Sequence, residues 1–299
     1  MPPGLSIIFV NHNSRGFLER ALGSLSRLDD SPTREAIVVD NASIGEEDPE
    51  AVCRRHGARL VRLRRNRGYG AAANVGSRYA RGRFVAVANT DIRFEGDILR
   101  VLVNQLECSP GLGVVGPQLV YPDGCPQPSA RRYPRLRYVL FGRRSPLRLV
   151  LPDARLGRAF LYRDAEASST PVSVEAVIGT FMVFRRGAFD AVGGFDERYF
   201  MFAEDVDICR RLRGQGWDVM LVPGARLEHY YGGVRRRHRR FTEFHRIKAL
   251  CRFLAAGRSW PVRGMILLGG FGYLALGELA GLAGVYEFEY SWRLRETRA

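Results

Sequence analysis

Polar side chains interrupt an apolar run close to residue 90. The segment VANTD covers residues 87–91, where Asn89 and Asp91 follow residues that are typical of a buried strand. One interpretation is an ordinary turn, because Asn and Asp favour turns and helix starts. The other is a cation site, because hard divalent cations prefer carboxylate oxygen. The choice depends on which other polar residues reach the same place.

Three further apolar runs end on a polar residue in the same way, at Asn11, Asp40 and Asn66. If the four runs are parallel strands of one sheet, their carboxyl ends form one edge, and such sheets bind ligands at that edge. Together with Asp91, these residues predict a binding site, whereas any one of them alone would be read as a turn residue.

The order of the predicted elements favours such a sheet. Strand-like apolar runs alternate with amphipathic helical patterns through the first 120 residues. This alternation predicts an α/β fold with a mostly parallel central sheet and helices on both faces. The predicted strands cover 5–11, 35–40, 58–66 and 83–91, and the longer predicted helices cover 15–27, 71–80 and 97–107.

The alternation stops after residue 120. Residues 121–171 are rich in proline and arginine, which predicts a loop-rich, basic insertion. A strand, a glycine turn and a second strand follow, and then a helix over 204–216 that ends at glycines. We expect another strand over 217–223 and a loop from there to His229.

The C-terminal part has a different composition. Six consecutive residues, 235–240, are all Arg or His, and residues 264–286 are apolar apart from Glu278. A helix or helix pair in the membrane interface is the favoured interpretation, with a membrane span and a packed soluble helix as alternatives. The expected domains are a catalytic domain at 1–233, containing a nucleotide-sugar-binding half at 1–120 and an acceptor half at 172–233, and a basic, apolar helical region at 234–299.

The charge balance limits the class of partner. The chain has 299 residues, a formal net charge of +15 and a pI of about 10.3, and Lys248 is its only lysine. Such a balance suits an anionic membrane face, a phosphorylated substrate or nucleic acid. No nucleic-acid-binding motif is recognisable, so we expect no nucleic acid partner. Five scattered cysteines without zinc spacing and the lack of a signal-peptide pattern predict reduced thiols in a cytoplasmic protein.

A set of motifs, in a fixed order, resembles a known family. The motifs are SIIFVNHNS, IVVDNAS, RNRGYGAAANVGSRYARG, ANTD, GGFDERYFMFAEDVDICRRLRGQGW and HYYGG, and they extend from Ser6 to Gly233. They resemble the inverting GT-A glycosyltransferases of family 2, especially bacterial rhamnosyltransferase-like members that build cell-surface polysaccharide. The resemblance implies a GT-A fold and single-displacement transfer of a sugar from a nucleotide.

The resemblance also assigns roles at the nucleotide end of the site. Asp91 matches the last acid of a DxD-like motif and would bind Mg²⁺ or Mn²⁺ together with His229, and Asp40 would accept the N3–H of uracil or thymine. Asn41 would contribute there, or would only cap the next helix with Ser43. The other residues expected around the nucleotide-sugar are Asn11, Asn13, Asn66, Gly68, Asn74, Asn89 and Thr90.

The acceptor hydroxyl needs a group that takes its proton. In the family this base is the Asp of an acidic pair at a helix start, which implies Asp205 here, with Glu204 orienting or contacting the acceptor. Acids at a helix start also favour the helix dipole, so a purely structural role is the alternative. Asp207 lies two residues further on and should point elsewhere on the helix.

The expected function is therefore that of a metal-dependent inverting glycosyltransferase. The expected donor is a dTDP- or UDP-sugar, with dTDP-L-rhamnose favoured, and the acceptor is a lipid-linked or cell-surface saccharide. The enzyme would be cytoplasmic and bound peripherally to the inner face of the cell membrane. The alternative is a basic membrane- or nucleic-acid-binding adaptor on a catalytically degenerate GT-A scaffold. The oligomeric state and the linkage formed stay open at this point.

Overall fold

The computed structural model describes residues 4–28, 32–135, 162, 168–230 and 239–282. The chain divides into two compact units. The first unit consists of residues 1–133 and 160–238, and the second consists of residues 134–159 and 239–299.

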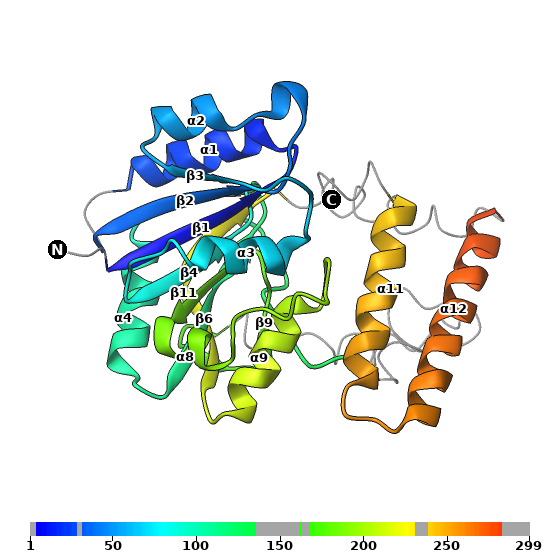
Figure 1. The fold of residues 1–299 in the computed structure, drawn as a ribbon. Coiled ribbons are helices and arrows are strands. Elements are labelled where there is room, and N and C mark those ends of the chain that lie inside the picture. Colours follow the sequence, from blue (N-terminus) through cyan, green and yellow to red (C-terminus); the bar gives the residue numbers. More distant parts are fainter. Residues whose placement is uncertain (1–3, 29–31, 136–161, 163–167, 231–238, 283–299) are drawn as a thin grey trace. The chain divides into compact units, whose positions relative to one another are not determined.

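The first unit is built on a nine-stranded mixed sheet (Figure 1). A separate two-stranded sheet pairs β7 (Ala130–Arg131) with β9 (Ala176–Val177). In sheet order, the large sheet contains β3 (Arg59–Arg62), β2 (Arg34–Asp40), β1 (Leu5–Asn11), β4 (Phe84–Ala88), β10 (Phe181–Arg185), β6 (Leu112–Val120), β11 (Asp218–His229) and β5 (Ile92–Arg93), with β8 (Val172–Ser173) paired to β11.

The N-terminal half of this sheet confirms the predicted parallel arrangement. Strands β3, β2, β1 and β4 are mutually parallel, and the register places Asn11 opposite Asp40 and Asp40 opposite Arg62. The polar strand ends therefore meet at one edge. In the other half β10 runs antiparallel to both β4 and β6, so the sheet as a whole is mixed.

Helices cover both faces of the sheet, as predicted. Ile7 and Phe9 of β1 pack in the core with Leu18 of α1 and Leu102 of α4. Ile8, which lies between them in the strand, points to the opposite face, where it contacts α3 at Gly76. Among the described residues of this unit, the helices are α1 (Arg15–Ser26), α2 (Glu50–Arg55), α3 (Tyr69–Ser77), α4 (Ile98–Cys108), α8 (Arg186–Ala191) and α9 (Glu204–Gly214), with a short 3-10 turn η1 at Gly45–Glu47.

Strand β11 is longer than expected. The prediction of a loop between residue 223 and His229 is wrong, because the strand continues through these residues. A register shift against β6 between Val222 and Arg226 accommodates the irregular backbone. From Ala225 onward, Ala225, Leu227 and His229 are buried and alternate with more exposed residues. His229 is thus held at the end of a paired strand.

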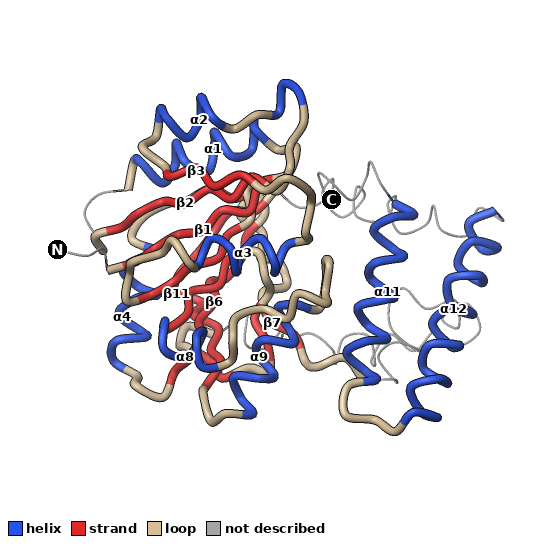
Figure 2. The backbone as a smooth tube through the Cα atoms, viewed as in Figure 1, coloured by secondary structure: helices blue, strands red, loops and turns tan. Residues whose placement is uncertain are grey.

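The second unit contains the helices α11 (Arg239–Ala255) and α12 (Trp260–Leu282), which pack against each other (Figure 2). This confirms the predicted helical C-terminal region. Within residues 239–282, and in the rest of the described chain, no helix is both long and apolar enough to cross a membrane.

Candidate active site

Asn11 and Asp40 form the floor of the site at the ends of β1 and β2. The Asn11 side-chain amide donates to Asp40 Oδ1 at 3.3 Å and to Ser43 Oγ at 3.1 Å. Asp40 is 3 % exposed, and the backbone N–H of Ser43 also donates to its Oδ1. Its second oxygen lies 3.8 Å from a terminal nitrogen of Arg62. One face of the carboxylate is therefore committed to the protein, and the other can accept a further hydrogen bond.

A chain of hydrogen bonds links this floor to the residue before Asp91. Ser14 Oγ donates to Asn11 Oδ1 and lies 2.9 Å from Thr90 Oγ1. Asn13, whose φ is 49°, accepts from the Ile44 N–H through its side-chain oxygen. The structure thus brings Asn11, Asn13 and Thr90 together around Asp40.

Asn41 organises the loop that follows β3. Its amide donates to Asn66 Oδ1 at 2.9 Å and to the Gly68 carbonyl, and its own oxygen accepts the Arg67 N–H. The predicted alternative of a helix cap does not hold, because the caps of η1 and α2 are Ile44 and Pro49. Asn41 and Asn66 instead fix the backbone that leads into α3.

Gly68 is the residue at which this loop approaches the loop before α9. Its φ is +88°, and a Cβ built on it would lie 2.3 Å from the Phe200 carbonyl oxygen. The next N–H, of Tyr69, donates to that same oxygen at 2.9 Å. Only glycine gives both this backbone conformation and this closeness.

Asp91 and His229 meet across the sheet edge, as predicted. The imidazole Nε2 lies 3.5 Å from Asp91 Oδ2, and the histidine is 7 % exposed. Two ligand atoms that bind one cation at right angles, each about 2.1 Å from it, are about 3.0 Å apart. The observed distance between Nε2 and Oδ2 is close to this value. Within the described residues, no cluster of three or more His, Cys, Asp or Glu side chains could complete such a site.

Gln127 fixes the tautomer of this histidine. Its amide nitrogen donates to the His229 carbonyl at 2.7 Å, so its oxygen is the acceptor that lies 2.8 Å from Nδ1. Nδ1 must therefore carry a hydrogen, and Nε2 is the ring nitrogen that faces Asp91 and could bind a cation. A histidine that donates its other ring N–H in this way is typical of metal ligands. The residues present fit a divalent cation.

The two acids at the start of α9 occupy different environments. Asp205 Oδ2 accepts from the Gly179 N–H at 2.8 Å and forms an ion pair with Arg131, while Oδ1 accepts the Val206 N–H. Glu204 is 8 % exposed, and its Oε2 is buried without a hydrogen-bond partner. Burial, followed by the charge of Asp205, raises the pKa of Glu204 to about 8.

The backbone before these acids is unusual. Phe202 and Ala203 have φ values of 67° and 62°, a region that residues with side chains seldom adopt. Ala203 is the N-cap of α9, so neither acid serves as the cap. Asp207 pairs with Arg210 and Arg211 of its own helix. These partners differ from those of Asp205, which agrees with the expectation that Asp207 points elsewhere on the helix.

Tyr69 lies near both Asp91 and the two acids at the start of α9. Burial is the main reason that the pKa of this phenol is well above its usual value, and the negative charges of Glu204, Asp205 and Asp91 add to it in that order. Its hydroxyl donates to the Gly179 carbonyl at 3.0 Å. The acids of β4–β5 and of α9 are therefore near one side chain, although they are separated by more than 100 residues in sequence.

Two predicted nucleotide-binding residues have structural bonds. The Asn74 amide donates to the Phe195 carbonyl and accepts the Phe195 N–H, so it holds the turn before α9. Asn89 donates its backbone N–H to the Thr180 carbonyl, and its side chain is half-buried. Sequence reasoning missed Gln127 and Arg131, which lie in the segment expected to be only a basic, loop-rich insertion. No motif marked either residue.

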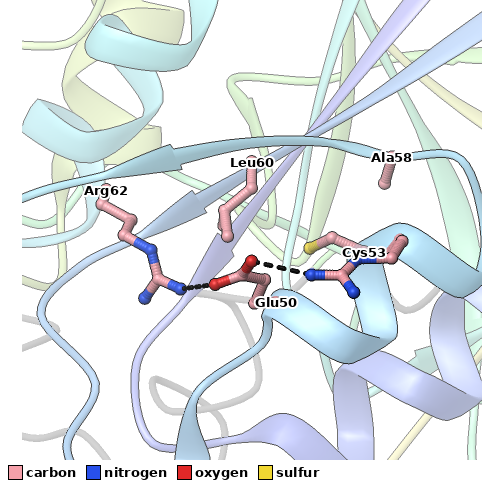
Figure 3. Close-up of a pocket in the computed structure, with 6 residues that line it drawn as sticks. Glu50, Cys53, Ala58, Leu60 and Arg62 are labelled. Carbon is pink, nitrogen blue, oxygen red and sulfur yellow. Dashed lines mark hydrogen bonds and ion pairs between the residues drawn. The ribbon is translucent and has the colours of Figure 1, made fainter.

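A pocket of about 340 Å³ lies beside α2 and β3 rather than beside the acids of α9 (Figure 3). Arg62 lines it and donates to Asp48 and Glu50, and Glu50 also pairs with Arg54 at 2.9 Å. The pocket shares with the site only the guanidinium that reaches toward Asp40. We therefore assign the chemistry to the sheet edge and not to this pocket.

Comparisons with known proteins point to one family. The model of glycosyl transferase family 2 matches residues 6–193, and the model described as the N-terminal domain of galactosyltransferase matches residues 160–235. The N-acetylglucosaminyl-diphospho-decaprenol L-rhamnosyltransferase of Mycobacterium tuberculosis is 33 % identical over 238 residues, which are 76 % of each chain. Rhamnosyltransferase WbbL of Escherichia coli is 42 % identical over 57 residues, covering 19 % of this chain and 22 % of that protein.

Solved structures show the same fold. The mannosyltransferase PcManGT from Pyrobaculum calidifontis, solved with GDP-Man and Mn²⁺, has a TM-score of 0.58 at 19 % identity, covering 98 % of this chain and 81 % of its own. GalNAc-T7, solved with UDP, GalNAc and Mn²⁺, has a TM-score of 0.60 at 16 % identity, covering 85 % and 48 %. These identities support the fold and no finer property.

Proposed function

The chain belongs to glycosyltransferase family 2, and from this membership we propose that it transfers L-rhamnose from dTDP-L-rhamnose to a lipid-linked saccharide by metal-dependent, inverting displacement. The observation that carries the proposal is the placing of the acids: Asp91 lies 3.5 Å from His229, and Asp205 and Tyr69 are both hydrogen-bonded to Gly179. The raised pKa of Tyr69, caused by burial and then by the charges of Glu204, Asp205 and Asp91, agrees with this arrangement. The choice of sugar and acceptor is supported by the mycobacterial relative, whose name specifies an L-rhamnosyltransferase that acts on a diphospho-decaprenol.

Asp40 is the proposed reader of the nucleobase. Its Oδ1 is occupied by Asn11 and Ser43, which leaves Oδ2 at the end of β2 as an acceptor. The N3–H of thymine or uracil is a matching donor, whereas cytosine presents an acceptor at that position. A buried acceptor of this kind discriminates between bases, because cytosine would place its N3 lone pair against Oδ2 and leave that oxygen with only the Arg62 guanidinium 3.8 Å away.

Asp91 and His229 are the proposed protein ligands of Mg²⁺ or Mn²⁺, with the phosphates of the donor supplying further oxygen ligands. A bound cation offsets the negative charge of the departing nucleoside diphosphate. Gln127 keeps the imidazole in the tautomer and orientation that this role needs.

Asp205 is the proposed general base. As the acceptor oxygen bonds to the anomeric carbon and the bond from that carbon to the diphosphate oxygen breaks, Asp205 takes the proton of the hydroxyl. Attack on the side opposite the leaving group inverts the anomeric carbon. Arg131 and the Gly179 N–H hold the carboxylate in place through Oδ2.

The test combines binding and turnover. Calorimetry with Mn²⁺ should show that dTDP-rhamnose binds in preference to UDP-glucose, UDP-GlcNAc and UDP-galactofuranose, and Asp91→Ala should abolish the Mn²⁺-dependent part of the affinity. Asp205→Asn should keep donor affinity and lower kcat by about 10²–10⁴-fold. Asp207→Asn, on the same helix but paired with arginines, serves as the control. Asp205→Asn with undiminished turnover would remove Asp205 as the base.

The second unit is the proposed membrane contact. On α12, the exposed fractions of Trp260, Met265, Leu268 and Phe271 are 83, 63, 73 and 64 %. At about 100° per residue these side chains lie on one side of the helix. Such an apolar face, on a chain with a net charge of +15, suits the interface of an anionic bilayer, where the acceptor lipid would be found.

Vesicle binding tests this contact separately. Leu268→Glu with Phe271→Glu should lower co-sedimentation with phosphatidylglycerol vesicles at least tenfold, because both side chains are exposed and the change should leave the fold intact. Ile44→Glu, at an apolar residue of the first unit that is 74 % exposed, is the matched control. Equal loss in both variants would refute α12 as the contact.

A further inference from the structure

Glu204 is a buried acid, and the proposed function gives it no chemical step because Asp205 acts as the base. Its carboxyl oxygen Oε2 is buried and has no hydrogen-bond partner. Helix α3 packs closely on it, since a Cβ added at Gly70 would lie 3.7 Å from the Glu204 Cβ. An acid in such a place is either neutral or paired with a cation.

The neighbouring groups supply charge compensation for only one acid. Arg131 from β7, together with the Gly179 N–H, is bound to Asp205 and not to Glu204. The charge of Arg131 also lowers the pKa of Glu204, but by less than burial and the charge of Asp205 raise it. From α3, the group that faces Glu204 is the neutral phenol of Tyr69, and from α9 it is the negative charge of Asp205. Ionising both acids would place two carboxylates beside a single guanidinium, which is unfavourable in a buried site.

We propose that Glu204 stays protonated in the working enzyme and donates a hydrogen bond to an oxygen of the acceptor saccharide, while Asp205 alone takes the proton of the attacking hydroxyl. The proposal rests on the proposed function, in which these acids face the acceptor. A neutral carboxyl is a hydrogen-bond donor and an ionised one is not, so the two protonation states recognise the acceptor differently. Glu204 keeps its proton throughout the transfer, and the proton from the acceptor stays on Asp205.

The pKa of Glu204, raised to about 8 by burial and then by Asp205, agrees with this state. At neutral pH most molecules carry the protonated acid, and the protonated fraction falls as the pH rises through 8. One unit above the pKa, about one tenth remains protonated, so the KM for the acceptor should rise about tenfold by pH 9. The affinity for the donor should not follow this change.

Three variants separate the protonated role from its alternatives. Glu204→Leu removes the donor and should raise the acceptor KM at least tenfold at pH 7. Glu204→Gln supplies an N–H donor of the same shape that cannot titrate, and it should restore most of the loss and abolish the rise in KM above pH 8. Asp205→Asn should lose kcat at every pH. Calorimetric donor affinity confirms that each variant is folded.

Two results would overturn the proposal. The first is a Glu204→Gln variant that keeps full donor affinity and is as inactive as Asp205→Asn, which would show that an ionised Glu204 is required. The second is an alkaline rise in KM that persists in Glu204→Gln, which would assign this rise to another group.

An infrared measurement tests protonation without any substrate. Wild-type protein at pH 7 should show the C=O band of a protonated carboxyl, which should be absent in Glu204→Gln and should disappear as the pH rises through 8. If this band is found but no sugar is transferred from any donor tested, the proposed function fails and the protonation state stands. If the band is missing while sugar is transferred, the proposed function stands and the proposed protonation state of Glu204 fails.

Discussion

Replacing Gly68 with alanine tests how the loop after β3 is joined to the loop before α9. A Cβ at this position would lie 2.3 Å from the oxygen, 2.8 Å from the Cα and 2.9 Å from the carbonyl carbon of Phe200. All three are backbone atoms, so no side chain can rotate away to make room. The loop around Phe200 would have to shift as a whole, and Glu204 follows it by only four residues.

Three costs add up in this variant. The backbone of Gly68, at φ 88° and ψ 171°, is in a region that is essentially restricted to glycine, and alanine there costs about 1–3 kcal/mol. Forcing a methyl group into a filled space costs about 1–3 kcal/mol, and losing the bond from the Tyr69 N–H to the Phe200 carbonyl costs about 1 kcal/mol. Gly68→Ala should therefore lower the free energy of unfolding by about 3–7 kcal/mol.

Gly124→Ala is the matched control. Its φ is +83°, but nothing lies within 4 Å of an added Cβ, so only the left-handed backbone is penalised, by about 1–2 kcal/mol. Chemical denaturation followed by circular dichroism measures both variants, and turnover with saturating donor shows whether the acids of α9 have moved. If Gly68→Ala is no more destabilising than Gly124→Ala, the close approach to Phe200 does not hold the loops together.

Two other changes act on residues that only the folded structure identifies. Gln127→Met removes the acceptor for His229 Nδ1 and should weaken Mn²⁺ binding about 10–100-fold by calorimetry, with donor affinity in the absence of Mn²⁺ unchanged; unaltered Mn²⁺ affinity would contradict the role given to this bond. Arg131→Met leaves Asp205 without its cation and should lower the free energy of unfolding by about 2–4 kcal/mol while preserving donor affinity. A variant as stable as the wild type would show that the ion pair is not formed in solution.

The N-terminal half of the fold could be predicted because its strands carry their own pattern. The apolar runs of β1 and β4 and the second half of β2 are buried. The strands β1 and β2 end on Asn11 and Asp40, and Asn89 follows directly after β4. Position in a parallel sheet then brings the ends together without further information. For the same reason Asn11, Asp40 and Asp91 could be placed at one edge from sequence alone.

Strand β6 escaped prediction because its composition reflects its neighbours. Gly113 and Gly116 interrupt the run, and each has a side chain packed over it: a Cβ there would lie 2.8 Å from Trp217 or Val177. Pro117 adds a residue that is unusual in a central strand. These residues fit contacts made by distant segments, which local periodicity does not contain.

The residues that hold the proposed base and metal ligand were missed for a related reason. Gln127 and Arg131 are polar residues in a proline-rich segment, and nothing in the local sequence distinguishes them from other loop residues. Their roles arise only when β7 pairs with β9 and when the residues before β7, which include Gln127, reach the end of β11. The acids and the imidazole of the proposed site could therefore be named from sequence, and the folded chain was needed to show what holds them.

The left-handed backbone at Phe202 and Ala203 has a consequence for engineering. Glycine at residue 203 would relieve the strain, so a screen that rewards heat resistance alone should favour that replacement. The same replacement would loosen the start of α9, on which Glu204 and Asp205 depend for their orientation. Variants selected only for thermal stability should therefore gain stability and lose turnover. We expect this loss of turnover to begin with substitutions at residues 202 and 203.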